Sequence, residues 1–292
     1  MEPAGMRRLD IGICSYGTDP ARLSKAIAAV RAFSTSDWRL FVIHNPSAGD
    51  ERTREAICGA QARDARIVPV WMPENVGYVG AVNELFRLAE SEYIAYMDFD
   101  AEVMTHGWDE ILCGYLDRFH EIGLIFPNGG AYPVNQGQYQ EILWAAGFCW
   151  VVSRMAQRKA GLMNTEIGHH EEVEWTGRIR RKGYKIASAP EVQVAHHETS
   201  TRSPESQERI AAGVVKWMNH ELSYYCGENV TYHSENVLRV LDWNANALHM
   251  EKFFKSRLPG LNADPQVIEI DGAEWDLIMV PRPKGFYRNR VI

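Results

Sequence analysis

Short, almost continuously apolar runs alternate with amphipathic segments from Leu9 to about Val194, and this alternation limits the fold more than any other feature. In the amphipathic segment after the first run, Leu23, Ile27 and Val30 recur at helical spacing. Strands that are apolar on both faces are typical of a mainly parallel sheet with helices on both sides. The sequence therefore predicts an α/β fold with a Rossmann-like, mainly parallel sheet flanked by helices.

The composition is that of a globular chain. Hydrophobic residues make up 46% and charged residues 24% of the chain, which excludes a disordered protein. A formal net charge of −7 argues against a surface built for polyanions, although a local basic patch is compatible with it. Five cysteines, an odd number without a CxxC pair, favour a reducing cytoplasm, and we expect neither a secretion signal nor a membrane span.

The pattern changes near residue 200. Beyond it, the periodicity predicts two long helices, followed by a pair of strands that turn at Asp271 and Gly272. We therefore expect a domain at 1–200 and a helical and β-hairpin C-terminal extension at 201–292.

The predicted strand that ends in YMDFD carries two acidic residues, Asp98 and Asp100. Because side chains alternate along a strand, both carboxylates are expected on one side, at the edge where open α/β sheets bind ligands. Paired carboxylates hold Mn²⁺ or Mg²⁺ against substrate phosphates. An acidic tripeptide also caps many elements, so the pair alone leaves both interpretations open.

Other strand ends carry polar groups suited to a phosphorylated ligand. In the turn ENVGYVGAVN, exposed amides and a helix amino terminus could approach a diphosphate or a sugar. A tight turn that needs glycine, with asparagine as a cap, explains this segment equally well. The candidate ligand-binding residues at these strand ends are Ser15, Tyr16, His44, Asn45, Asn75, Gly77 and Asn83.

A helix is predicted in HHEEVEWTGRIRRKGYKI, where Gly183 ends it. Glu171 and Glu172 lie early and Arg178 lies late, which suits the helix dipole. This match explains the charges without any catalysis.

The order of these segments resembles the family 2 inverting glycosyltransferases of the GT-A fold. The resemblance covers residues 9 to about 198 and includes ICSYGTDPARL, NVGYVGAVN, YMDFD, AAGFCWVVSR, the acidic helix and PEVQVAHH. It implies metal-dependent transfer of a sugar from a nucleotide-diphospho-sugar to an acceptor hydroxyl. The domain at 1–200 would then have a donor half at about 1–105 and an acceptor half at about 106–200.

The resemblance assigns the metal ligands. Asp98 and Asp100 match the DxD motif that holds Mn²⁺ or Mg²⁺ against the diphosphate. His196 matches a histidine that completes the metal shell, and His197 is the competing assignment.

The resemblance also assigns a base, with two departures. Glu171 and Glu172 match an acidic pair whose second carboxylate is the general base, but Glu172 stands where aspartate is usual. His44 and Asn45 replace the acidic residue that contacts the nucleotide base, so the base is left open; a buried His44 with both nitrogens bonded is the alternative.

Further roles concern the substrates. Tyr16 matches the tyrosine of the first donor loop, and Gly147 matches the small residue beside the acceptor. Trp144 and Trp175 could shape the acceptor groove, although a tryptophan is more often part of the core. We expect the acceptor to be a glycan or a lipid-linked sugar. After residue 200, an apolar stripe is expected either to pack on the domain or to form a homodimer contact.

Three alternatives stay open. A sugar nucleotidyltransferase would open with a basic, Gly-rich triphosphate loop, where this chain offers Arg22 alone. A non-catalytic sugar-nucleotide binding module is compatible with the departure at Glu172. A transferase acting on hydroxylated DNA bases would use the basic run 178–185, against the net charge.

Overall fold

The computed structural model describes residues 8–17, 19–128, 133–136, 138–142, 145, 147–166, 171–197, 266–270, 273–279 and 289–291. The chain divides into two compact units, Met1–Thr165 with Trp175–Ser200 and Glu166–Glu174 with Thr201–Ile292. The elements before residue 200 are β1 (Leu9–Tyr16), α1 (Pro20–Phe33), β2 (Trp38–Asn45), α2 (Glu51–Arg63), β3 (Ile67–Trp71), α3 (Gly77–Leu88), β4 (Tyr93–Asp98), β5 (Ala101–Val103), α4 (Trp108–Arg118), β6 (Ile122–Pro127), β7 (Pro133–Gln136), β8 (Gln140–Ile142), β9 (Cys149–Ser153), α5 (Arg154–Ala160), α6 (Glu171–Arg181), β10 (Lys185–Ala189) and β11 (Val194–His196).

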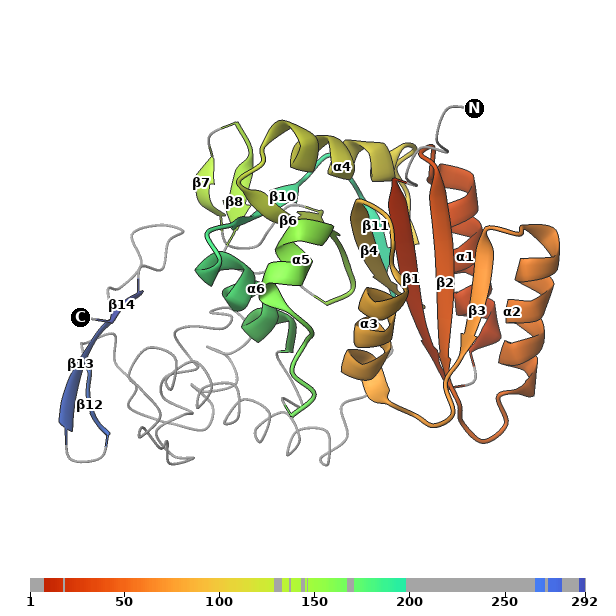
Figure 1. The fold of residues 1–292 in the computed structure, drawn as a ribbon, viewed down its shortest axis with the longest axis horizontal. Coiled ribbons are helices and arrows are strands. Elements are labelled where there is room, and N and C mark those ends of the chain that lie inside the picture. Colours follow the sequence, from red (N-terminus) through yellow and green to blue (C-terminus); the bar gives the residue numbers. More distant parts are fainter. Residues whose placement is uncertain are drawn as a thin grey trace. The chain divides into compact units, whose positions relative to one another are not determined.

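Among the described residues, a nine-stranded sheet forms the centre of the first unit, in the order β3-β2-β1-β4-β9-β6-β10-β8-β7 (Figure 1). β1 pairs in parallel with β2 and β4, β2 with β3, and β6 with β10. β9 and β8 run against their neighbours. The predicted α/β fold with a mainly parallel sheet is confirmed, and the carboxyl ends of β1, β2, β3 and β4 lie along one edge.

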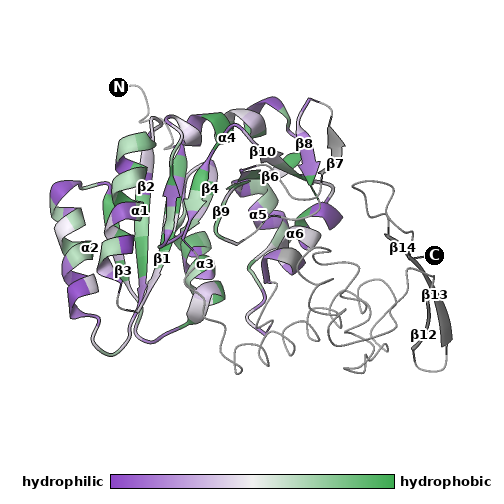
Figure 2. Ribbon diagram, turned by 180° about the vertical axis from the view of Figure 1, so that it is seen from behind, coloured by the Kyte–Doolittle hydropathy of each residue, from purple (hydrophilic) through white to green (hydrophobic). Residues whose placement is uncertain are grey.

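Helices cover both faces of this sheet. Buried residues of α1, α2 and α4 belong to one core cluster, and buried residues of α3, α5 and α6 belong to a second. Neighbouring residues of β4 alternate between the two, so that Met97 packs in the first cluster and Tyr96 in the second. Figure 2 shows the central strands in hydrophobic colour and hydrophilic stretches on α2.

A glycine makes room for a side chain of α3 against the sheet. A Cβ added to Gly12 of β1 would lie 2.4 Å from Cδ2 of Leu85 on α3. Any larger residue at this position would therefore force the Leu85 side chain to move out of its place between α3 and β1.

The described part of the second unit includes β12 (Gln266–Ile270), β13 (Ala273–Met279) and β14 (Asn289–Val291). β12 and β13 pair antiparallel on either side of positions 271 and 272, where the sequence predicts a strand pair, and β14 adds a further strand beside β13. The predicted helices of the extension lie outside the described residues. Among the helices that are described, none has the length and apolar character needed to cross a bilayer.

Candidate active site

The two acidic residues of the YMDFD segment meet across a turn. β4 ends at Asp98, the following two residues form a turn, and β5 begins at Ala101. The expectation that one continuous strand carries both carboxylates is therefore wrong, because the chain leaves the sheet after Asp98. The turn nevertheless brings the Asp100 side chain, which is almost fully buried, next to Asp98.

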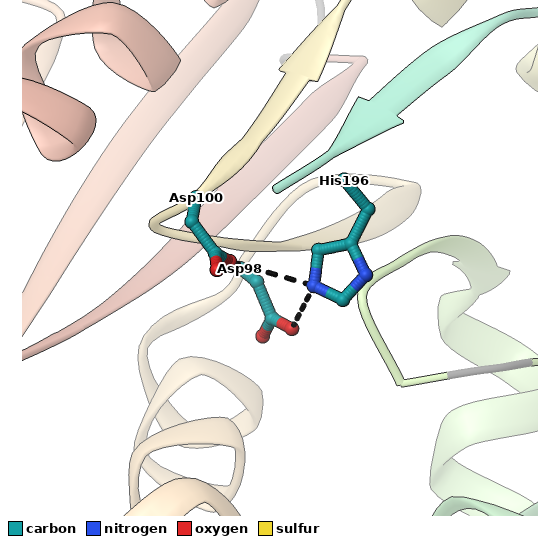
Figure 3. Close-up of side chains that lie close together, drawn as sticks. All are labelled: Asp98, Asp100 and His196. Atoms are coloured by element: carbon teal, nitrogen blue, oxygen red, sulfur yellow. Dashed lines mark ion pairs between the residues drawn. The ribbon is translucent and has the colours of Figure 1, made fainter. Parts of the chain in front are cut away.

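A short ribbon of two strands adds a histidine from far along the chain. β11 pairs antiparallel with β5, which sets His196 opposite Ala101. Nε2 of His196 lies 3.5 Å from Oδ2 of Asp98 and 3.5 Å from Oδ1 of Asp100 (Figure 3). One ligand atom from each of these three residues lies within 4.8 Å of the other two.

Neighbouring contacts single out His196 over His197. Nε2 of His197 lies 3.1 Å from Oε1 of Glu102, away from the two aspartates. The ring of Phe148 stacks on the His196 ring, with centroids 4.6 Å apart and planes 13° from parallel. The Phe148 carbonyl also accepts a hydrogen bond from the backbone N–H of Asp98 at 2.8 Å, so one residue supports two of the three candidate ligands.

Each carboxylate has a second contact that the sequence analysis did not assign. The Tyr96 hydroxyl donates to Oδ1 of Asp98 at 2.7 Å. Nη1 of Arg22 lies 3.9 Å from Oδ2 of Asp100 and donates to the His197 carbonyl at 2.9 Å. Strand alternation could have identified Tyr96, which precedes Asp98 by two residues on β4. Arg22 also pairs locally with Asp19, at 3.0 Å between Nε and Oδ2, but its contacts with Asp100 and His197 join segments far apart in the chain and have no local signal.

The charges of this site shift the pKa values of the groups in it. The neighbouring carboxylates of Asp100 and Asp98 outweigh burial and raise the pKa of His196 to about 9. Burial raises the pKa of Asp100, but the contact with His196 and the charges of His196 and Arg22 lower it more. Burial, with the charge of Asp98, raises the pKa of Tyr96 well above its usual value, so the hydroxyl remains a donor. A protonated His196 therefore supplies positive charge beside both aspartates, and a cation bound by the three residues would compete with that proton.

A family comparison identifies the chain. The model of glycosyl transferase family 2 matches residues 10–183. The chain belongs to glycosyl transferase family 2. This assignment confirms the resemblance seen in the ordered segments of the sequence. No curated protein matches the chain in sequence.

Solved structures show that this family 2 chain has the GT-A fold. GalNAc-T7 with UDP, GalNAc and Mn²⁺ aligns with a TM-score of 0.61 at 13% identity, over 86% of this chain and 55% of that one. Mannosyltransferase PcManGT from Pyrobaculum calidifontis, in complex with GDP-Man and Mn²⁺, aligns with a TM-score of 0.59 at 13% identity, over 87% of this chain and 80% of PcManGT. TarS from S. aureus aligns with a TM-score of 0.60 at 9% identity, over 86% of this chain and 46% of TarS, so the chain spans less than half of TarS.

Three of the predicted donor residues of the family 2 chain are accessible. Tyr16, at the end of β1, is 52% exposed. Asn75 is exposed and its Oδ1 accepts a hydrogen bond from the N–H of Gly77 at 2.9 Å. Gly77 begins α3 with φ of 68°, a left-handed conformation that favours glycine. The strand-to-helix turn is thus a tight turn, and its outer surface is open to solvent.

His44 and Ser15 are buried instead, and protein groups occupy their polar atoms. Nδ1 of His44 lies 3.2 Å from Oγ of Ser15, and Nε2 lies 2.7 Å from Oδ2 of Asp50. His44 is 1% exposed. We therefore assign both residues to the support of the strand ends rather than to direct contact with a donor.

The two buried asparagines also hold backbone segments. Asn45 donates to the Gly77 carbonyl at 3.2 Å and accepts from the Val76 N–H at 3.1 Å, which fixes the turn before α3. Asn83 donates to the carbonyl of Met163 at 2.9 Å and accepts from its N–H at 2.8 Å. Both asparagines therefore hold backbone segments behind the turn, and their contact with a donor stays a prediction.

The three predicted acceptor residues lie in different environments. Trp175 is 0% exposed, its Nε1 donates to the Gly161 carbonyl at 3.0 Å, and it stacks on Phe86 with centroids 5.0 Å apart. We therefore assign Trp175 to the core rather than to an acceptor site. Gly147 lies half-buried in the turn before β9, and Trp144 lies outside the described residues.

The acidic pair lies where the sequence predicts, in the first turn of α6. Glu171 and Glu172 are both half-buried, and burial raises the pKa of Glu171. At the other end of the helix, the Arg178 guanidinium donates to the carbonyls of Ala160 and Leu162 at 2.7 Å each. Arg178 thus anchors α6 to the end of α5 and the segment that follows it.

Proposed function

We propose that this family 2 chain is a metal-dependent, inverting glycosyltransferase that moves a sugar from a nucleotide-diphospho-sugar to an acceptor hydroxyl. The observation that carries the proposal is the convergence of Asp98, Asp100 and His196 at the carboxyl end of β4, where a parallel α/β sheet binds its ligands.

The donor set fits a first-row divalent cation. Two carboxylate oxygens and one imidazole nitrogen lie within reach of one position. Mg²⁺ prefers oxygen ligands alone, whereas imidazole suits transition ions, so the mixed set favours Mn²⁺. A cation bound there would offset the negative charge that develops on the departing diphosphate. PcManGT and GalNAc-T7 were both solved with Mn²⁺, which supports this choice.

Accessible groups at the neighbouring strand ends would bind the donor. We propose Tyr16 for the nucleoside, and Asn75 with Gly77 for the diphosphate and sugar, because these are exposed beside the amino terminus of α3. His44 has both ring nitrogens occupied by protein groups, so we assign it no contact with the nucleotide base. Neighbours solved with UDP and with GDP-Man leave both bases in the proposal.

Glu172 is the proposed general base, with Glu171 beside it. Its carboxylate takes the proton of the acceptor hydroxyl while the acceptor oxygen forms a bond to the anomeric carbon. The bond from that carbon to the diphosphate oxygen breaks, and the diphosphate leaves with the electron pair. A single displacement of this kind inverts the anomeric configuration and needs one acceptor-side carboxylate.

The acceptor is proposed as a glycan or lipid-linked sugar. A DNA acceptor would be bound by the basic run 178–185, which begins with Arg178. The contacts of Arg178 with two backbone carbonyls reduce the support for that acceptor. The cytoplasm remains the proposed compartment, because the described cysteines Cys14, Cys58, Cys113 and Cys149 are free thiols.

The test follows release of nucleoside diphosphate from UDP- and GDP-sugars with Mn²⁺, because hydrolysis of the donor needs no known acceptor. We expect metal-dependent release, and a loss of about 10²- to 10⁴-fold in turnover for Glu172→Gln with donor affinity retained. Glu55→Gln, an exposed acid on α2, is the matched control and should keep wild-type rates.

Two results would contradict the proposal. A wild-type protein that binds the donor without releasing diphosphate would be a non-catalytic binding module. If Glu171→Gln lost far more turnover than Glu172→Gln, the base would be the first member of the acidic pair.

A further inference from the structure

The two oxygens of each aspartate face different groups. For Asp98, Oδ1 accepts from the Tyr96 hydroxyl at 2.7 Å, whereas Oδ2 faces Nε2 of His196 at 3.5 Å. For Asp100, Oδ1 faces His196 and Oδ2 faces Arg22 at 3.9 Å. In both residues, one oxygen points toward the shared cation position and the other points to an outer contact. The contact of Tyr96 is the shorter of the two and has normal hydrogen-bond length.

The Tyr96 ring itself is held firmly. It is 1% exposed and stacks on Trp150, with centroids 5.5 Å apart and planes 26° from parallel. Tyr78 packs against it edge-on, with centroids 5.2 Å apart. A hydroxyl on so constrained a ring has little freedom to follow a rotating carboxylate, so it fixes the orientation of that carboxylate.

We propose that Tyr96 is a positioning residue for cation binding, whose hydroxyl holds Oδ1 of Asp98 so that Oδ2 is presented to the ion. This inference rests on the cation site of the proposed function and adds a residue that never touches the ion. Hydrogen bonds to ligating carboxylates fix their orientation before the ion arrives, and loss of such a partner typically weakens metal binding by about 10- to 100-fold.

The chain offers a matched control on the same strand. Tyr93 of β4 is also buried, and its hydroxyl also donates to an aspartate, Asp117. Tyr93 packs in the other core cluster, at the opposite end of β4 from Asp98. Tyr93→Phe and Tyr96→Phe therefore remove the same chemical group, a hydroxyl that donates to an aspartate, but only the Tyr96 change lies beside the cation site.

The experiment titrates purified protein with Mn²⁺ and follows free Mn²⁺ by electron paramagnetic resonance, without donor or acceptor. We expect Tyr96→Phe to weaken Mn²⁺ binding by about 10-fold and to alter the spectrum of the bound ion, while Tyr93→Phe keeps wild-type affinity. Circular dichroism checks that both variants are folded. A merely structural role for the hydroxyl would affect the two variants alike.

The outcomes separate this inference from the proposed function. If wild-type protein binds Mn²⁺ and Tyr96→Phe binds it equally well or more tightly, the positioning role is overturned and the cation site stands. If both variants lose affinity equally, the effect is one of general stability and the inference is again overturned. If wild-type protein binds no Mn²⁺, the cation site fails, and the positioning role fails with it.

Discussion

Buried carboxylates lie at both ends of the parallel strands, but their charged partners lie at different distances. At the amino end of β1, the buried Asp10 accepts bonds from Nε and Nη2 of Arg39 at 2.9 and 3.1 Å. It accepts two more from the amides of Glu90 and Ser91, at 2.6 and 2.9 Å. Burial raises the pKa of Asp10, but these bonds and the charge of Arg39 lower it more. The positive charge of Arg39 thus balances the negative charge of this carboxylate within the protein.

At the carboxyl end of β4, the charged groups near the aspartates lie farther away. His196 lies 3.5 Å from both Asp98 and Asp100, and Arg22 lies 3.9 Å from Asp100. These distances are longer than the hydrogen-bond distances around Asp10 and longer than those of ordinary hydrogen bonds. At the amino end an aspartate joins neighbouring strands, and we call this the joining end. At the carboxyl end we propose that the looser contacts leave the carboxylates available for an added cation, and we call this the cation end.

Removal of the carboxylates at the cation end should have the largest effect. We expect the double variant Asp98→Asn with Asp100→Asn to lose Mn²⁺ binding and to release nucleoside diphosphate at least about 10⁴-fold more slowly, because metal stabilisation of the leaving group contributes several kcal/mol. Calorimetric Mn²⁺ titration and a diphosphate release assay measure both quantities. Turnover within tenfold of wild type would place the cation elsewhere.

The same kind of change at the joining end should affect stability instead. Asp10→Ala leaves the Arg39 guanidinium and two amides without their shared acceptor, and breaking a buried ion pair in this way costs about 3–5 kcal/mol of unfolding free energy. Urea denaturation measures the loss, and Mn²⁺ affinity of the folded fraction should stay unchanged. A variant with wild-type stability and impaired Mn²⁺ binding would reverse the comparison.

Raised pH should destabilise the cation end when no metal is present. The folded-state pKa of His196 is raised from 6.5 to about 9, so its stabilising effect is complete below pH 6.5 and is lost as pH rises through about 9. The expected loss is no more than about 3–4 kcal/mol, since each pKa unit corresponds to about 1.4 kcal/mol. Urea denaturation at several pH values in chelated buffer measures it.

The same proton competes with the ion, so the apparent Mn²⁺ affinity should increase with pH over this range. His196→Gln should abolish this pH dependence of stability. A wild-type unfolding free energy that is flat between pH 6.5 and 9 would contradict the proximity of the three side chains.

Arg22 should show the smallest effect. Its charge partly offsets that of Asp100 across 3.9 Å, and its side chain is 34% exposed. Coulomb energy over about 4 Å in water is about 1 kcal/mol, so Arg22→Met should tighten Mn²⁺ binding by about fivefold or less at low salt. Arg22→Lys keeps the charge and should leave the affinity near wild type. Weaker binding in Arg22→Met would show that its bond to the His197 carbonyl matters more than its charge.

The sequence predicted the elements of the sheet well, because runs such as Tyr93–Asp98 and the amphipathic helices have one clear period each. It could not predict the ribbon of β5 and β11. Each strand has only three residues, and their pairing depends on a register between segments far apart in the chain. That register also decides between His196 and His197, which are adjacent in sequence.

Burial separates interpretations that the sequence left open for several donor and acceptor residues. A buried His44 with both nitrogens bonded was one of two interpretations, and His44 and Asn45 do turn inward to bond the neighbouring loops. Trp175 lies one turn after Glu172 on α6, and helical spacing alone does not show that its face packs against Phe86. Such side chains are distinguished only by the elements that pack against them.

The proposed function depends on a divalent cation held jointly by Asp98, Asp100 and His196. Crystals grown with Mn²⁺ and UDP or GDP, measured at the manganese absorption edge, would show where that cation binds. We expect one strong anomalous peak within coordination distance of all three side chains, with diphosphate oxygens on its open side. A manganese peak elsewhere in the protein, or bound nucleotide with no peak beside Asp98 and Asp100, would contradict it.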